Sequence, residues 1–494
     1  MKQNSSAFTL IHNLTMSEKR YFKIFSERHT IGIQNKYVIL FDILDHAKEE
    51  NDDKIKLALK KQDVNPQFLS ADRNYLYHLI LKSLNDFHDS KTLNLEIKEL
   101  LLSIEILFQK GMYVECLKLI SRSETQALEC ENYALMIDIL TWKKKCAGYS
   151  IGLKAANEIN QQIEVFLKLL NDLKKITNLY YKSYFIQLNA EGVFNSSHRA
   201  QMDKILEHPI IRKEEEIETF TGRVFYSIIK ANHALVNGDK KKESLTIEKL
   251  IRMIEESKTY GLENPLDFVS IYSRLIAIQK NGDKKYFFES IQKLKAFGEL
   301  KHIRKELVQQ RIFMHCNTHE LEYYLMNREI KSAILRVQQM ETEIEKSNFK
   351  LENYHLIYFN YLKSAIYVSS QQPNKALKVI NTTLNNFLLE DRAQVMIRMM
   401  ILNMVCHYEL KNFELIPSIY KKLLLMNKKT PMLLKSELKL VEELHHLSQI
   451  INPTKKESIE IFQAVIQQIQ IDSSIKKSNL LENYKSWIQT KINS

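Results

Sequence analysis

Two histidines one helical turn apart are the side chains in this sequence with the clearest potential for chemistry. His315 and His319 are four residues apart, so a helix would place both imidazoles on one face. Helical zinc sites often begin with such a pair, but they need two further ligands. None follows at a motif spacing, and Cys316 stands where the His-Glu-x-x-His motif has its glutamate. We therefore favour a polar helix face beside a core cysteine, and we predict neither a metal site nor a catalytic residue.

The rest of the sequence contains little that would indicate a phosphate-binding loop or a nucleophilic catalytic site. There are only 10 glycines in 494 residues, and no G-x-x-x-x-G-K-[ST], G-x-G-x-x-G or G-x-S-x-G motif occurs. The five cysteines are odd in number, form no C-x-x-C pair and lie in apolar helical segments. That usage is typical of reduced thiols in a cytoplasmic protein. We expect a cytoplasmic protein that is not an enzyme and binds no cofactor.

The elements that would position any site are helices, because turn residues recur at a period in the forties. Glycines are spaced at intervals of 41, 40, 46 and 44 residues, and the series continues without glycine at intervals of 45, 46 and 39. The positions are Gly111, Gly152, Gly192, Gly238, Gly282, Asn327, Pro373 and Asn412. Such a period is typical of stacked helix pairs. We predict an all-α protein, a right-handed α-solenoid of about eight or nine antiparallel helix pairs over residues 93–471.

The turn at Gly111-Met112-Tyr113 carries a family resemblance. Glycine would let the chain leave one helix, and the small side chain of Cys116 would let the next helix pack closely. Ala333 and Ala376 occupy the same small position after later turns. These features resemble tetratricopeptide-like repeats, and the chain is also similar to uncharacterised bacterial proteins with degenerate helical repeats. The resemblance implies a groove, lined by the first helix of each pair, that binds a protein or peptide.

Polar residues within those first helices are therefore candidate partner contacts. Cations would hold acidic groups of a bound segment, and amides would hold its backbone. The candidates are Arg223, Lys230, Asn232, Arg274, Gln279, Arg311, Lys363 and Arg398. Tyrosines also cluster on these helices, where they either grip a partner or fill the space between helix pairs, and we favour the second role. They are Tyr180, Tyr181, Tyr184, Tyr323, Tyr324, Tyr354, Tyr358 and Tyr361.

The two ends of the chain fall outside the repeat. Residues 1–92 are expected to form about four helices, one of them opened by a capping box at Thr15 and Glu18. Their last helix, at about 70–87, permits a helix-turn-helix reader of DNA, but we favour a cap that closes the first repeat. Residues 472–494 are expected to form a C-terminal capping helix, with Trp487 and Ile488 on the core.

The net charge of +12 admits nucleic acid or an acidic protein as a partner, although the lysines are scattered in a way that favours solvated helix faces. No apolar run approaches the ~18 residues of a membrane span, so we expect no membrane partner. The favoured hypothesis is a non-enzymatic scaffold that binds a peptide or partner helix. The alternative is a regulator whose N-terminal helices contact nucleic acid or an output partner while the repeats sense a ligand. A metal enzyme centred on His315 is the remotest hypothesis.

Overall fold

The computed structural model describes residues 5–27, 35–87, 92–150, 153–190, 194–303, 306–347, 351–388, 392–429, 433–450, 455–475 and 480–493. Most of these residues lie in helices, and none of them lies in a β-strand, so the protein is all-α as predicted. The chain divides into two compact units, residues 1–91 and 92–494. Two glycines of the predicted turn series, Gly152 and Gly192, lie outside the described residues.

The described residues of the first unit form five helices where the sequence predicted four. They are α1 (Ser6–Asn13), α2 (Met16–Glu27), α3 (Lys36–His46), α4 (Asp52–Lys60) and α5 (Leu69–Phe87). The capping box is confirmed, because Thr15 Oγ1 accepts from the Glu18 amide at 3.2 Å and the Glu18 carboxylate accepts from the Thr15 amide at 2.7 Å. The additional helix, α1, is capped by Ser5 and buries Phe8 and Ile11, which are three residues apart on one face.

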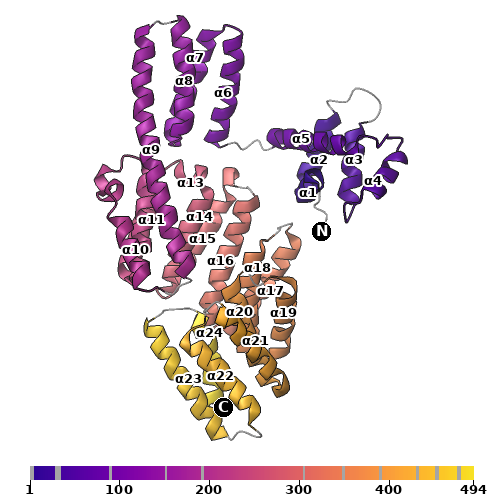
Figure 1. Ribbon diagram of the computed structural model, residues 1–494, viewed down its shortest axis with the longest axis vertical. Helices are drawn as coiled ribbons and strands as arrows, with labels where there is room; N and C mark the ends of the chain where they lie inside the picture. The colour runs from indigo at the N-terminus through magenta and orange to yellow at the C-terminus, as the bar shows by residue number, and fades with distance from the viewer. Residues whose placement is uncertain are drawn as a thin grey trace. The chain divides into compact units, whose positions relative to one another are not determined.

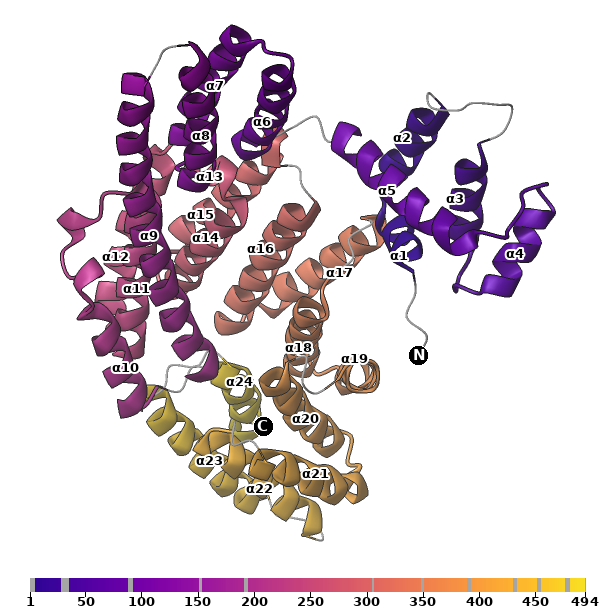
Figure 2. The ribbon, with the colours of Figure 1, turned by 45° about the horizontal axis from the view of Figure 1, so that its top comes forward.

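The second unit, residues 92–494, places successive helices side by side (Figures 1 and 2). Its first helices are α6 (Leu93–Gln109), α7 (Tyr113–Glu129), α8 (Tyr133–Ser150), α9 (Leu153–Ala190), α10 (Ser196–Leu206), α11 (Phe220–Val236), α12 (Lys240–Glu256), α13 (Tyr260–Glu263), α14 (Pro265–Gln279) and α15 (Lys284–Glu299). The remainder are α16 (Glu306–Met326), α17 (Ile330–Lys346), α18 (Asn353–Ser369), α19 (Pro373–Asn386), α20 (Ala393–Glu409), α21 (Ile416–Lys429), α22 (Lys435–Gln449), α23 (Lys455–Ile475) and α24 (Leu480–Asn493). Short 3-10 turns include η1 (Pro209–Ile211) and η2 (Glu214–Glu216). Alternate helices also meet, since α16 contacts α14 and α18, and α20 contacts α18 and α22.

The helix ends explain why turn residues recur along the chain. Gly111 and Gly238 have φ of 73° and 75°, and Arg328, Gln371 and Lys411 adopt similar positive φ values at the ends of α16, α18 and α20. After each of these residues the next amide bonds back to a carbonyl five residues earlier. For example, the Asp239 amide donates to the Ala234 carbonyl at 2.9 Å. This is the Schellman arrangement, which satisfies the last carbonyls of a helix.

The expected period breaks between Gly152 and Gly192. The sequence predicted a helix pair there, but one helix of 38 residues, α9, fills the interval. Its residues 153–190 contain no glycine or proline that would end a helix. The N-terminal half of α9 packs Ile159 into the core of α6–α8, and its C-terminal half packs Leu179 and Ile186 with α10 and α11.

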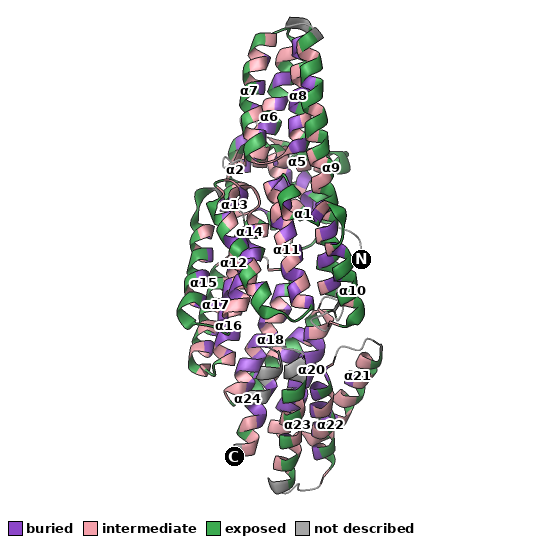
Figure 3. Cartoon of the chain, turned by 90° about the vertical axis from the view of Figure 1, so that its left-hand side faces the viewer, coloured by how far each residue is buried: buried purple, intermediate pink, exposed green. Residues whose placement is uncertain are grey.

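The core runs between facing helices, and exposed residues lie on their outer sides (Figure 3). The small residues Cys116, Ala333 and Ala376 are fully buried, which permits close helix packing. In the C-terminal helix α24, Tyr484, Trp487 and Ile488 are buried. They do more than close the chain end, since α24 contacts α16 and α18 as well as its neighbour α23.

Candidate functional site

Two of the predicted partner contacts, the buried Asn232 and the partly buried Arg274, bond to each other. Arg274 Nη1 donates to Asn232 Oδ1 at 2.5 Å, and Arg274 Nη2 donates to Glu243 Oε1 at 2.8 Å. The Asn232 amide in turn donates to Ser183 Oγ at 3.0 Å, and the residue is only 1 % exposed. The network therefore links α9, α11, α12 and α14, and its polar groups are satisfied by one another.

Three further predicted contacts also bond to neighbouring helices. Arg311 reaches His355 Nε2 at 2.8 Å and the Glu352 carboxylate at 3.0 Å. Lys363 pairs with Glu341 on α17. Arg398 donates to Glu437 Oε1 at 2.7 Å, and their side chains are 6 % and 0 % exposed. Removing one partner of such a buried pair typically costs 3–5 kcal/mol, so Arg398 holds α20 to α22.

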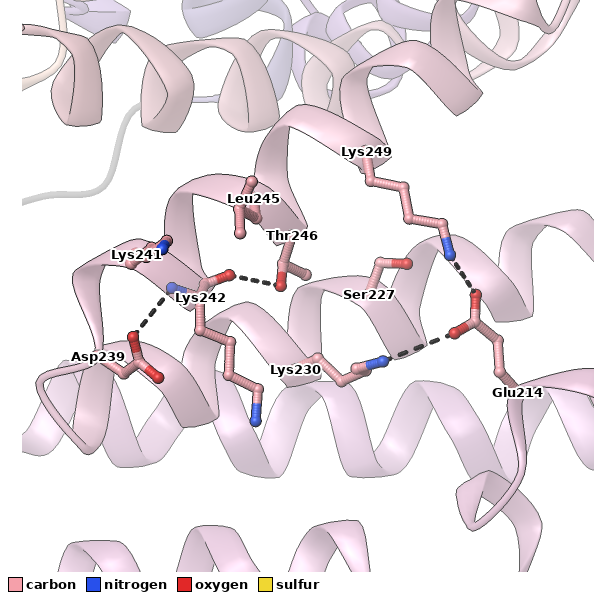
Figure 4. Close-up of a pocket in the computed structure, with 9 residues that line it drawn as sticks. All are labelled: Glu214, Ser227, Lys230, Asp239, Lys241, Lys242, Leu245, Thr246 and Lys249. Atoms are coloured by element: carbon pink, nitrogen blue, oxygen red, sulfur yellow. Dashed lines mark hydrogen bonds and ion pairs between the residues drawn. The ribbon is translucent and has the colours of Figure 1, made fainter.

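The remaining predicted contacts, Arg223, Gln279 and Lys230, are partly accessible. Arg223 is half-buried on α11. Gln279 lines a cavity of about 710 Å³ between α12, α14 and α15, where its buried Oε1 has no hydrogen-bond partner among the described residues. Lys230 lines a separate cavity between α11 and α12 (Figure 4). The eight residues therefore do not converge on one groove.

The cavity at Lys230 has a strongly basic lining. Lys230 lies 5.0 Å from the centre of the Tyr226 ring, which helps to hold the ammonium group in place. Figure 4 shows Lys230 and Lys249 reaching Glu214 from two different helices, at 3.6 Å and 3.4 Å. The complete lining is Glu214, Ser227, Lys230, Asp239, Lys241, Lys242, Leu245, Thr246 and Lys249.

His315 and His319 share one serine as a hydrogen-bond partner. Ser273 Oγ lies 2.9 Å from both His315 Nδ1 and His319 Nε2, and His319 Nδ1 lies 3.2 Å from the Glu322 carboxylate. Glu322 also binds Lys280 and the Tyr358 hydroxyl. Among the described residues, no group of three or more His, Cys, Asp and Glu side chains is arranged to hold a metal ion.

The hydrogen-bonded chain from Ser273 through His319 to Glu322 has the same sequence of contacts as the Ser-His-acid triad of a hydrolase. The surroundings of this chain do not suit acyl transfer. Ser273 lies within α14, where the backbone N–H groups are used by the helix and cannot form an oxyanion hole. Ser273 is also only 8 % exposed. The cluster therefore acts as a polar contact between α14, α16 and α18.

A row of exposed apolar side chains lies on α9, and it includes Tyr181 and Tyr184, two tyrosines for which the sequence analysis favoured a packing role. Tyr181, Tyr184, Phe185 and Leu188 are between 44 % and 52 % exposed, and their spacing places them along one face of the helix. The opposite face of α9 is buried, with Tyr180 stacked on Phe225 at 4.8 Å. We name these four exposed residues the α9 stripe.

A groove of about 550 Å³ lies beside the α9 stripe, between α9 and α10. Its floor contains Leu179, Ile186 and Ile205, and its rim carries basic and amide side chains without a carboxylate. The lining residues are Leu179, Lys182, Phe185, Ile186, His198, Gln201, Lys204, Ile205 and His208. Phe185 belongs to both the stripe and the groove, so the two form one continuous surface, the α9–α10 surface.

Part of the basic charge of the N-terminal unit is paired with carboxylates of the same unit. Arg73 on α5 pairs with Glu50 at 3.0 Å and with Asp52 at 2.7 Å. Lys19 and Lys36 are likewise paired with aspartates. A helix-turn-helix reader would present the basic side chains of α5 to DNA. Arg73, one of these side chains, is instead neutralised by carboxylates of its own unit.

No described helix combines the length and apolar character needed to cross a membrane. Comparisons with protein-family models, curated proteins and solved structures found no match to this chain.

Proposed function

We propose that this protein is a non-enzymatic interaction scaffold, built as a tetratricopeptide-like solenoid of helix pairs, whose α9–α10 surface binds an acidic amphipathic helix of a partner protein. The contacts between alternate helices and the repeated Schellman turns support the solenoid. The observation that carries the function is the α9 stripe, a row of half-exposed aromatic and aliphatic side chains beside a groove without carboxylates. Continuous apolar surface of this kind marks binding sites on soluble proteins.

The chemistry of the surface defines the partner. Apolar side chains of a bound helix, spaced at three and four residues, would pack against Tyr181, Phe185 and Leu188. Lys182 and Lys204 stand on opposite walls of the groove, one on α9 and one on α10. Carboxylates flanking the apolar face of the partner would meet these ammonium groups, which favours an acidic partner over a basic one. Binding would then be anchored by the aromatics and oriented by charge.

Two synthetic helical peptides with the same apolar face test the proposal, one flanked by glutamates and the other by lysines. Fluorescence anisotropy should detect saturable binding of the acidic peptide alone. Phe185→Ala should weaken that binding about tenfold or more, since buried aromatic anchors dominate interface energies. The matched control is Val165→Ala, because Val165 is 57 % exposed on the same helix but lies outside the groove.

Charge reversal supplies the second arm of the experiment. In the double variant Lys182→Glu and Lys204→Glu, preference should shift from the acidic to the basic peptide. Equal binding of both peptides by the unmodified protein, or equal losses in the Phe185 and Val165 variants, would contradict the proposed site.

A further inference from the structure

The cavity beside Lys230 has the size of a small-ligand site and a mostly charged lining. Its volume is about 350 Å³, within the roughly 300–1,000 Å³ typical of small-molecule sites. It lies between α11 and α12 and is bounded on a third side by Glu214 of η2. Four ammonium groups and two carboxylates line it, so the lining carries two positive charges in excess (Figure 4).

The two carboxylates neutralise the lysines only in part. Asp239 Oδ1 accepts from the Lys242 backbone amide at 2.9 Å, where it caps α12. Glu214 is shared between Lys230 and Lys249, at separations longer than a usual charge-assisted hydrogen bond. Among the described residues, no carboxylate pairs with the ammonium group of Lys241 or Lys242.

Lysines without carboxylate partners are not a general feature of helix N-termini in this protein, as a comparison of α12 with α15 shows. Helix α15 begins in the same way, with Asp283 as its cap followed by Lys284 and Lys285. There Lys284 pairs with Glu329 at 2.8 Å, and Lys285 lies 3.9 Å from Glu289. Cations in a first helical turn oppose the helix dipole. The α15 lysines are compensated by acidic partners, whereas Lys241 and Lys242 on α12 are not.

We infer that the cavity lined by Lys230, Lys242 and Lys249 binds a phosphate group, either as the free ion or as the monoester of a small molecule. A phosphate dianion matches the charge excess of the lining. Ammonium groups arriving from α11 and α12 would donate hydrogen bonds to its oxygens. The hydroxyls of Ser227 and Thr246 already donate to backbone carbonyls, so recognition falls to the lysines. None of the lining residues belongs to the α9–α10 surface, so this site is separate from the proposed helix-binding function.

Isothermal titration calorimetry of the full chain with inorganic phosphate and with phosphoserine tests the inference, using sodium chloride at matched ionic strength as the blank. One saturable site is expected. Lys242→Gln and Lys230→Gln should each weaken binding about tenfold, the factor for one lost charge-assisted hydrogen bond. Tighter binding of phosphoserine would identify a monoester as the ligand, and tighter binding of inorganic phosphate would identify the free ion.

Lys285→Gln on α15 is the matched control and should leave phosphate binding unchanged. Lys242→Gln should also raise Tm without phosphate, because it removes a cation opposed to the helix dipole. Lys230 lies away from that helix end, so its variant separates ligand binding from helix stability. Absence of saturable binding, or equal weakening by the Lys242 and Lys285 variants, would overturn the inference.

Discussion

Ser273 and its histidine neighbours show how buried polar residues fix their own proton positions. His319 Nδ1 faces the Glu322 carboxylate and so carries a proton, which leaves Nε2 to accept from the Ser273 hydroxyl. Ser273 can then accept from Nδ1–H of His315. Burial and the neighbouring His319 lower the pKa of His315 to about 3, and burial beside Arg311 lowers the pKa of His355 to about 4. These rings are therefore neutral in the folded protein.

The neutral histidines predict a stability that declines in mild acid. Below an unfolded pKa of about 6.5, the unfolded chain takes up protons that buried His315 and His355 do not bind. The contribution of the two neutral rings to the free energy of unfolding is therefore complete above about pH 6.5. It is lost as the pH falls toward about 4, at up to ~1.4 kcal/mol per pH unit for each ring. Calorimetric Tm values between pH 7.5 and 5 should fall more steeply for the native chain than for His315→Gln. Parallel slopes would show that His315 does not take part.

At the scale of elements, α24 joins helices that are distant in sequence. Trp487 Nε1 donates to Glu409 Oε1 at 2.6 Å, and the indole packs against Phe462 with 5.4 Å between ring centres. The Tyr484 hydroxyl donates to the Arg398 carbonyl at 3.3 Å. A helix that only capped the last repeat would touch its immediate neighbours. The wider contacts of α24 make it part of the core that contains α16, α18 and α20.

Trp487→Ala should therefore destabilise a region well beyond α24. Loss of a buried tryptophan typically costs 3–5 kcal/mol. Hydrogen exchange should accelerate in α18, α20 and α24, while α6–α8 should be unchanged because their buried residues form a separate core cluster. Leu425→Ala, at a site 59 % exposed on α21, is the control and should have little effect. Faster exchange confined to α24 would contradict this role.

At the scale of the whole molecule, the chain contains two separately built cores. Residues 1–91 bury Phe22, Phe41, Leu76 and Ile80 in a cluster of their own. The second unit is far larger and holds several clusters along its length. A unit of about 90 residues with its own core is large enough to fold independently.

Leu76→Ala is expected to affect only the first unit. The side chain is fully buried, and its truncation should cost about 2–5 kcal/mol through lost contacts and a residual cavity. Calorimetry should show that residues 1–91 unfold at a lower temperature in this variant, while the unfolding temperature of residues 92–494 is unchanged. Ser257→Ala, outside that unit, provides a comparison. A common shift of all transitions after Leu76→Ala would show that the units fold cooperatively.

Local interactions are the part of this protein that its sequence predicted well. The capping box at Thr15 involves neighbours in the chain, and the positive φ at Gly111 and Gly238 ends helices where the glycine spacing indicated. Helix α1 was missed because His12 and Asn13 interrupt its apolar pattern, although the Ser5 cap and the Phe8–Ile11 spacing were available signals. The interval from Gly152 to Gly192 was misread because the period was extended over a segment without a helix-ending residue.

The sequence by itself determined the all-α class and many helix ends, because propensity, capping and turn formation depend on residues a few positions apart. Only the tertiary structure decided which polar and aromatic side chains remain accessible. Arg274 and Arg398 carry the same charge as Lys242, but long-range pairing with Glu243 and Glu437 leaves Arg274 mostly covered and Arg398 buried between helices. Tyr180 and Tyr181 are adjacent in sequence, yet one stacks on Phe225 and the other faces solvent. Neither outcome is encoded locally, because each depends on a helix supplied by a distant part of the chain.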